Sequence, residues 1–106
     1  MRLSFIFLVL FSLELLGSVY KGQAVYAKKC AKCHAKQSFI QSKVKAYWSD
    51  SLKNGGKNLS DIHLKTKKAK KSWNYFKSSK FMQNSKHLKD FLEEYAKDSG
   101  KVPACN

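Results

Sequence analysis

The sequence has almost no arginine and few acidic residues. Arg2 is its only arginine, and seven Asp and Glu oppose 21 Lys and Arg, so the 106 residues carry a formal net charge of +14. A charge of this size attracts acidic partners over long distances at low ionic strength. Readout of nucleic-acid bases favours the fork of an arginine over the point charge of a lysine. We therefore expect an acidic partner and no nucleic acid.

Cysteines and long apolar runs are also scarce. Three cysteines make at most one disulfide, which excludes a disulfide framework as the source of stability. The N-terminal apolar run over residues 3–16 has fourteen residues, whereas a membrane-spanning helix needs about 20. It follows a basic N-terminus and precedes the small residues Gly17 and Ser18, as in a secretory signal peptide. We predict that residues 1–18 are a signal peptide cleaved near residue 18, or else an uncleaved anchor; both place the rest of the chain in the periplasm.

Strand patterns are absent from the rest of the sequence. No stretch alternates apolar and polar residues over more than a few positions, and apolar residues recur instead at helical spacing in four segments. The segments run over residues 22–33, 39–52, 58–76 and 88–95. Glycines end the second segment at Gly55 and Gly56 and the fourth at Gly100. We predict one all-α domain of about four helices over residues 19–106. A domain of this size needs a cross-link or a bound cofactor to stabilise it besides its apolar core.

One short motif would attach such a stabilising cofactor: Cys30-Ala31-Lys32-Cys33-His34. Two cysteines separated by two residues and followed by a histidine form the attachment signature of a c-type haem. On a helix or tight turn, Cys30 and Cys33 project from one side, where both sulfurs reach the vinyl groups of one porphyrin. His34 then offers a nitrogen to the iron. The motif predicts a single haem c, covalently bound, around which the helices pack.

Other interpretations of the two cysteines stay open. A thioredoxin-like redox pair is expected beside a βαβ pattern, which this sequence lacks. A zinc site would recruit Cys30, Cys33, Cys105 and one histidine. A disulfide between Cys30 and Cys33 would close a very small ring and stabilise little. The role of Cys105 itself is open between a disulfide with a partner, a disulfide-linked dimer and an unused thiol.

Around this motif the chain resembles class I cytochrome c. That family has a glycine eight residues before the first cysteine and an aromatic residue four before it, and here these are Gly22 and Tyr26. The glycine allows a close crossing with the C-terminal helix, which in the family carries a leucine followed three residues later by an aromatic residue. Leu92 and Tyr95 fit that pattern. The resemblance implies a small cytochrome c fold. The sequence departs from the family pattern at Ala35, where a glycine is common.

The family also binds the far side of the iron with a methionine. Met82, which lies 48 residues after His34 and, we expect, in the loop before the last helix, is the residue that the resemblance assigns to this role. A methionine raises the reduction potential, whereas a second histidine lowers it. The alternatives are His63, His87 or an open sixth position. The only proline of the chain, Pro103, comes too late to orient His34 or to flank the methionine as prolines do in the family.

Lysines are dense around the attachment motif and in the third predicted helix. They are Lys28, Lys29, Lys32 and Lys36, and Lys65, Lys67, Lys68, Lys70 and Lys71. Around a haem edge, such lysines would guide docking onto acidic redox proteins or an anionic membrane surface.

The sequence thus predicts a periplasmic monohaem c-type cytochrome that carries one electron between larger redox proteins and is not an enzyme. The alternatives are a haem protein with an open distal site for gas or peroxide chemistry, and a basic interaction protein stapled by zinc or a disulfide.

Overall fold

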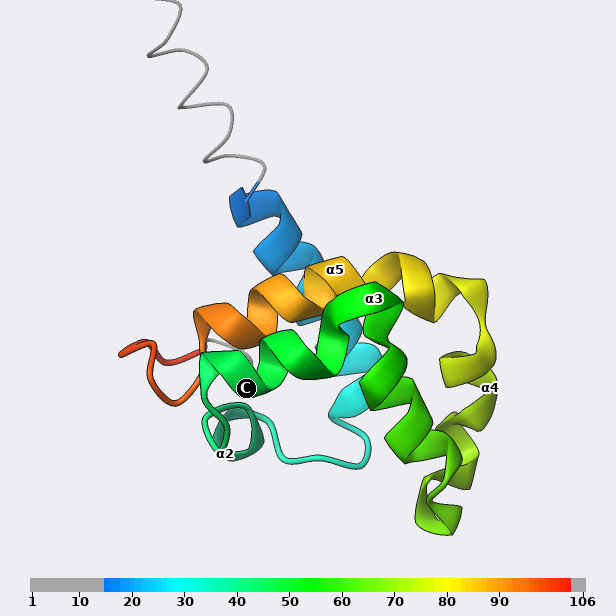
Figure 1. The fold of residues 1–106 in the computed structure, drawn as a ribbon. Helices are drawn as coiled ribbons and strands as arrows, with labels where there is room; N and C mark the ends of the chain where they lie inside the picture. The colour runs from blue at the N-terminus through cyan, green and yellow to red at the C-terminus, as the bar shows by residue number, and fades with distance from the viewer. Residues whose placement is uncertain (1–14, 104–106) are drawn as a thin grey trace, which may run out of the picture.

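The computed structural model describes residues 15–103, and these residues form helices joined by short loops (Figure 1). Residues 15–25 are α-helical and continue into a π-helix. The elements after residue 25 are η1 (Tyr26–Cys30), α2 (Gln37–Ile40), α3 (Lys45–Leu64), η2 (Lys67–Ser72), α4 (Trp73–Lys77) and α5 (Ser79–Glu94). No strand is present within residues 15–103. The predicted all-α class is confirmed, with five α-helices in this part of the chain where about four were expected.

The glycines at the end of the second predicted helix break α3 in its middle. Residues 53–56 leave the helical conformation, and Asn54, Gly55 and Gly56 adopt positive φ angles of 54°, 70° and 79°. The predicted stop is therefore confirmed, and α3 consists of two helical parts that meet at this kink. The kink sets the direction of residues 57–64, the part of α3 that carries His63.

Two of the predicted helices are shorter than expected. The segment over residues 39–52 is not one helix, because α2 ends at Ile40 and Val44 is extended, with ψ 164°. The segment over residues 58–76 is also interrupted, because Thr66 is extended and a 3-10 helix follows it. Five lysines crowd residues 65–71, and like charges three or four residues apart destabilise an α-helix. The prediction of one helix over residues 58–76 used only the spacing of apolar residues and did not include this repulsion.

The last helix begins earlier than the apolar pattern predicted. Ser78 caps its N-terminus, where the Ser78 hydroxyl accepts a hydrogen bond from the Phe81 amide at 3.3 Å. Since α5 starts at Ser79, Met82 lies within the first turn of this helix. The expectation that Met82 lies in a loop before the last helix is therefore wrong.

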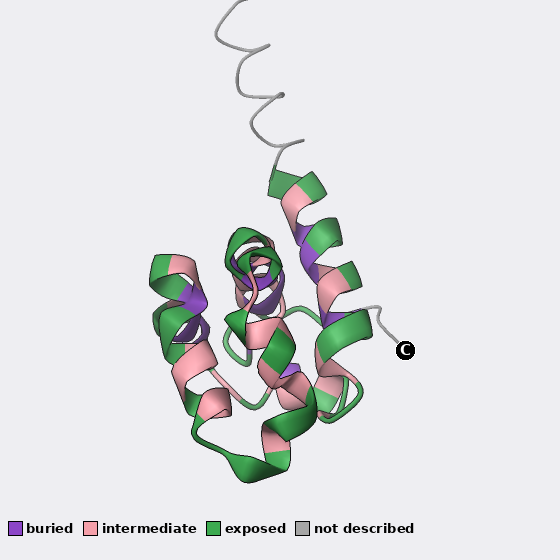
Figure 2. Cartoon of the chain, turned by 90° about the vertical axis from the view of Figure 1, so that its right-hand side faces the viewer, coloured by how far each residue is buried: buried purple, intermediate pink, exposed green. Residues whose placement is uncertain are grey.

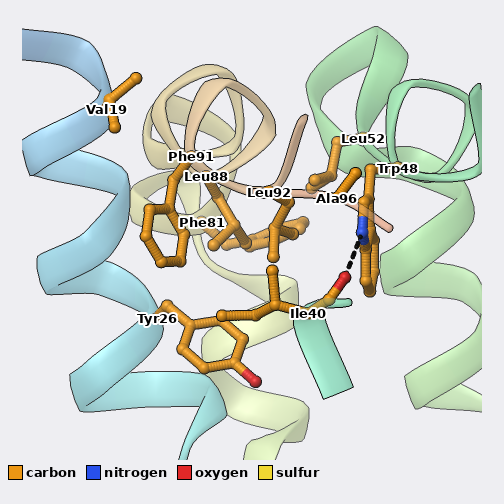
Figure 3. Packing of buried hydrophobic residues seen from close by; sticks show 10 residues of the cluster. All are labelled: Val19, Tyr26, Ile40, Trp48, Leu52, Phe81, Leu88, Phe91, Leu92 and Ala96. Carbon is orange, nitrogen blue, oxygen red and sulfur yellow. Dashed lines mark hydrogen bonds between the residues drawn. The ribbon is translucent and has the colours of Figure 1, made fainter. Parts of the chain in front are cut away.

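The core gathers apolar side chains from the first helix, α2, the first part of α3 and α5 (Figure 3). Its buried members are Val19, Tyr26, Ile40, Trp48, Leu52, Phe81, Leu88, Phe91, Leu92 and Ala96. The Trp48 indole donates a hydrogen bond to the Ile40 carbonyl at 3.1 Å, which ties α3 to the end of α2. In Figure 2 the buried residues lie on the sides of the helices that face one another.

The first helix crosses α5 at Gly22. A Cβ atom at Gly22 would lie 2.0 Å from the His87 carbonyl oxygen and 2.6 Å from the Phe91 Cβ. The close crossing that the resemblance implied is confirmed. Its partner on α5 is one turn earlier than expected, because Phe91 faces Gly22 and its ring lies 5.8 Å from that of Tyr26.

The pattern of leucine and aromatic residue occurs twice along α5, which explains the shift. Leu88 and Phe91 repeat the spacing of Leu92 and Tyr95, and Leu88, Phe91 and Leu92 are all buried. The sequence pattern cannot choose between two copies on one helix face. At Gly22 the contacting atoms of α5 belong to His87 and Phe91, and neither Leu92 nor Tyr95 is among them.

The predicted signal peptide falls mostly outside the described residues. Residues 15–18 begin the first helix, and the Ser18 hydroxyl lies 2.8 Å from His87 Nδ1 and donates to Asp90. Within residues 15–103, no helix is both long and apolar enough to cross a membrane. Cleavage near residue 18 stays a prediction.

Candidate functional site

The attachment motif begins where the π-helix ends. The Ala31 amide donates to the Tyr26 carbonyl at 2.9 Å, a bond that spans five residues, and the His34 amide donates to the Cys30 carbonyl at 2.9 Å. The Cys33 amide also reaches the Cys30 carbonyl, at 3.2 Å. π-Helices are rare and occur frequently at functional sites. This winding folds Cys33 and His34 back toward Cys30 within a single turn.

The two cysteines of the motif have different surroundings. Cys30 is half-buried and packs against the core, whereas Cys33 is exposed, and both are free thiols in this structure. Burial, followed by the neighbouring Cys33, raises the pKa of the Cys30 thiol to about 12. The core therefore holds the Cys30 sulfur in place, while the Cys33 sulfur faces solvent.

This difference predicts unequal reactivity of the two thiols in the haem-free chain. Compared with a thiol whose pKa is 9.0, a thiol at about 12 carries about a thousandfold less thiolate near pH 8. The greater nucleophilicity of a thiolate of higher pKa offsets part of this factor, so in a Cys105→Ser background iodoacetamide should alkylate Cys33 about tenfold or more faster than Cys30. Peptide mass spectrometry over time measures both rates. Equal rates in the native chain would contradict the burial of Cys30, and the urea-unfolded chain, in which the rates should converge, is the control.

His34 is held between aromatic rings. Its ring stacks on Phe39, with centroids 4.1 Å apart and planes 14° apart. The ring of His63 lies 6.1 Å from that of His34, at an interplanar angle of 86°. Burial, with a smaller effect of His63, lowers the pKa of His34. The imidazole is therefore neutral at neutral pH and has the lone pair that a metal ligand requires.

His63 comes from the part of α3 that follows the kink. Its ring stacks on Phe76, with centroids 4.1 Å apart. His63 Nδ1 lies 2.7 Å from the Leu59 carbonyl oxygen, and since a carbonyl only accepts, Nδ1 must be the donor. In the neutral tautomer that makes this bond, the lone pair is on Nε2. Metal-binding histidines are oriented by this kind of bond from the other ring nitrogen to a carbonyl.

The two other candidate ligands lie elsewhere. The side chain of Met82 is 64% exposed, and a Cβ atom at Gly55 would lie 2.9 Å from Met82 Cγ. Met82 lines an open pocket of about 250 Å³ together with Phe76 and Phe81, and the lining of this pocket includes neither His34 nor a cysteine. Met82 thus packs on the kink of α3 and faces outward.

His87 belongs to the helix crossing. Its backbone carbonyl faces Gly22, and its ring is within hydrogen-bonding distance of Ser18. Burial and then the charges of Lys21 and Lys86 lower the pKa of His87, and Asp90 partly opposes this. Of the three residues considered for the far side of the iron, the described contacts place only His63 beside His34.

Two groups of aromatic rings flank the histidine pair. Phe39, stacked on His34, also packs against Trp48, with centroids 5.6 Å apart. Phe76, stacked on His63, packs against Phe81 at 4.8 Å. These rings give both histidines aromatic surroundings. Phe39 begins and Phe76 ends predicted helical segments, and the histidine ring that each of them contacts became visible only in the structure.

The hydroxyl of Tyr75 is a further polar group in the vicinity of Cys30. Its buried hydroxyl makes no hydrogen bond of good geometry. Burial raises the pKa of Tyr75, Asn84 opposes this, and Cys30 adds a smaller upward effect. The ammonium of Lys29 lies 5.0 Å from the centroid of the Tyr75 ring. A buried hydroxyl without a well-placed partner is uncommon in folded proteins.

The zinc hypothesis finds no support among the described residues. Within residues 15–103, no three His, Cys, Asp or Glu side chains come together as a metal-binding group. Cys105, the third cysteine of that hypothesis, lies outside the described residues. The donor types fit a haem better, because two thiols and one imidazole follow one another in a single turn and a second imidazole lies 6.1 Å from the first.

Comparison with known proteins gives no family for this chain. No protein-family model matches it, and no curated protein or solved structure matches it. The functional assignment therefore depends on the motif, on the helix crossing and on the geometry of the site.

Proposed function

We propose that this protein is a periplasmic monohaem c-type cytochrome that carries single electrons. The observation that carries the proposal is the turn in which Cys30, Cys33 and His34 follow one another, with His34 neutral and stacked on Phe39. The close crossing at Gly22 supports it, because the resemblance to class I cytochrome c implied this contact from residues outside the motif.

The residues of the site would hold the cofactor rather than transform a substrate. Cys30 and Cys33 would each form a thioether, so that the haem is not lost while the protein diffuses between partners. His34 would bind the iron, and the Phe39 ring would fix the orientation of the imidazole. The haem supplies the chemistry of taking up and releasing one electron at its iron. We propose that the protein is a carrier and not an enzyme.

The lysines around the motif would guide its partners. Lys28, Lys29, Lys32 and Lys36 are all exposed, and so are the five lysines over residues 65–71. The ion pairs found within residues 15–103 use other lysines, namely Lys53, Lys57, Lys89 and Lys101. The charge of the nine lysines is therefore available to an acidic redox protein, or to an anionic membrane surface. Association should weaken as ionic strength rises.

An absorption spectrum tests the proposal. The protein, exported in a host that matures c-type cytochromes, should show a sharp α-band after reduction with dithionite, and this band should survive acid–acetone extraction. The double variant Cys30→Ser, Cys33→Ser should lose all extraction-resistant haem, because no thioether remains. Pyridine haemochrome assay and intact mass measure the loss.

The matched control is the third cysteine. Cys105→Ser should keep the full haem content, the spectrum and the mass increase of one haem. A colourless wild-type product that contains zinc would refute the cytochrome proposal and favour the basic interaction protein.

A further inference from the structure

The starting observation is the distance between two histidines that lie 29 residues apart in the sequence. Their ring centroids are 6.1 Å apart. Two imidazoles that bind one metal ion from opposite sides have centroids about 6 Å apart, since each metal–nitrogen bond is about 2 Å long. The separation of His34 and His63 therefore matches that of two axial ligands of one iron.

The hydrogen bond of His63 points to the same role. With Nδ1 donating to the Leu59 carbonyl at 2.7 Å, the proton of the neutral ring is fixed on Nδ1 and the lone pair on Nε2. The stack on Phe76 further restricts rotation of the ring. A ring that is held by a carbonyl on one nitrogen and offers a lone pair on the other is prepared to bind a metal.

The competing residues have other contacts. Met82 is exposed and packs on Gly55, at the kink of α3. The ring of His87 is engaged with Ser18 at the crossing of the first helix and α5. Either residue would have to give up its position in the fold to reach His34, whereas His63 already lies beside it.

We propose that His63, and not Met82, is the second axial ligand of the iron, opposite His34. This inference rests on the proposed function. Two imidazole ligands lower the reduction potential relative to an imidazole and a thioether. The partners of this protein would then be redox proteins that exchange electrons at low potential.

The test compares three variants of the haem-loaded protein: His63→Ala, His87→Ala and Met82→Ala. The wild-type ferric protein should be low-spin and lack the weak far-red charge-transfer band that marks a methionine ligand. His63→Ala should become high-spin. Because this variant removes the side chain that competes with carbon monoxide, the apparent affinity of the ferrous protein for the gas should rise by about tenfold or more. His87→Ala and Met82→Ala should keep the wild-type spectrum and affinity.

A replacement that keeps a ligand guards against misfolding of the alanine variant. His63→Met should remain low-spin, gain the far-red band and have a higher reduction potential than the wild type. Redox titration and the far-red spectrum measure both effects.

The outcomes separate this inference from the proposed function. A far-red band in the wild type that Met82→Ala abolishes would overturn the role of His63 while leaving the cytochrome assignment intact. A high-spin wild type that binds carbon monoxide as well as His63→Ala does would also overturn it, in favour of an open distal site. Absence of an extraction-resistant α-band would refute the cytochrome itself, and the inference with it.

Discussion

Gly22→Ala should destabilise the protein by about 3 kcal/mol, although alanine is the better helix former. Helix propensity alone would favour alanine over glycine by about 1 kcal/mol. The added Cβ would lie 2.0 Å from the His87 carbonyl oxygen, which is a backbone atom of α5 and cannot rotate away. The two helices would have to separate, and overpacking of this kind costs about 1–3 kcal/mol or more. Urea unfolding followed by circular dichroism measures the change.

A change of similar size at an exposed position of the same helix is the control. Ala24 is exposed, so Ala24→Ser should change the free energy of unfolding by about 0.5 kcal/mol or less. If Gly22→Ala is as stable as the wild type or more stable, the first helix does not cross α5 at this residue. The main structural support for the resemblance to class I cytochrome c would then be lost.

Gly56→Ala should cost about 3 kcal/mol for two separate reasons. Gly56 has a φ of +79°, a left-handed conformation that costs an alanine about 1–2 kcal/mol. The added Cβ would also lie 2.5 Å from Cζ of Phe81 and 3.2 Å from the Ser85 Cβ. Phe81 is 2% exposed, so a shift of its ring would disturb the packing around it. Thermal unfolding of the variant measures the combined effect.

Gly100 provides a control that separates the two causes. Its φ of +73° is nearly the same, but no atom lies within 4 Å of its added Cβ. Gly100→Ala should therefore cost only the conformational part, about 1 kcal/mol. Equal losses of stability in the two variants would contradict the tight packing of the kink against Phe81.

The kink also matters for the site. Phe81 packs against Phe76, and Phe76 stacks on His63. A displaced Phe81 would therefore disturb the support of His63, so a holoprotein carrying Gly56→Ala should bind carbon monoxide more readily than the wild type. Gly100→Ala, remote from these rings, should not show this effect.

The lengths of several helices were only partly predictable from the sequence. Apolar spacing correctly excluded strands and placed a break at Gly55 and Gly56, because a glycine pair is a strong local signal. Apolar spacing predicted one helix over residues 58–76, because the spacing of apolar residues contains no information on the repulsion among the lysines within that segment. Element ends of this kind depend on charges and caps such as Ser78 more than on periodicity.

The candidate site was also only partly predictable from the sequence. Cys30, Cys33 and His34 are neighbours in the chain, so their spacing alone was enough to identify them as a unit. His63 belongs beside them only because α3 bends and returns its second part toward the motif. Its bond to Leu59 and its stack on Phe76 have no signature in the sequence.

The sequence by itself determined the helical class, the Cys30-Ala31-Lys32-Cys33-His34 motif and the excess of lysine, because each depends on residue type at short spacing. The glycine at the helix crossing came from the resemblance to class I cytochrome c. The tertiary structure decided which copy of the leucine–aromatic pair meets Gly22, that Met82 faces outward, and that His63 faces His34. These outcomes depend on the kink at residues 53–56 and on the packing of side chains that are distant in the chain. A local pattern therefore singled out Cys30, Cys33 and His34, and only the fold brought His63 beside them.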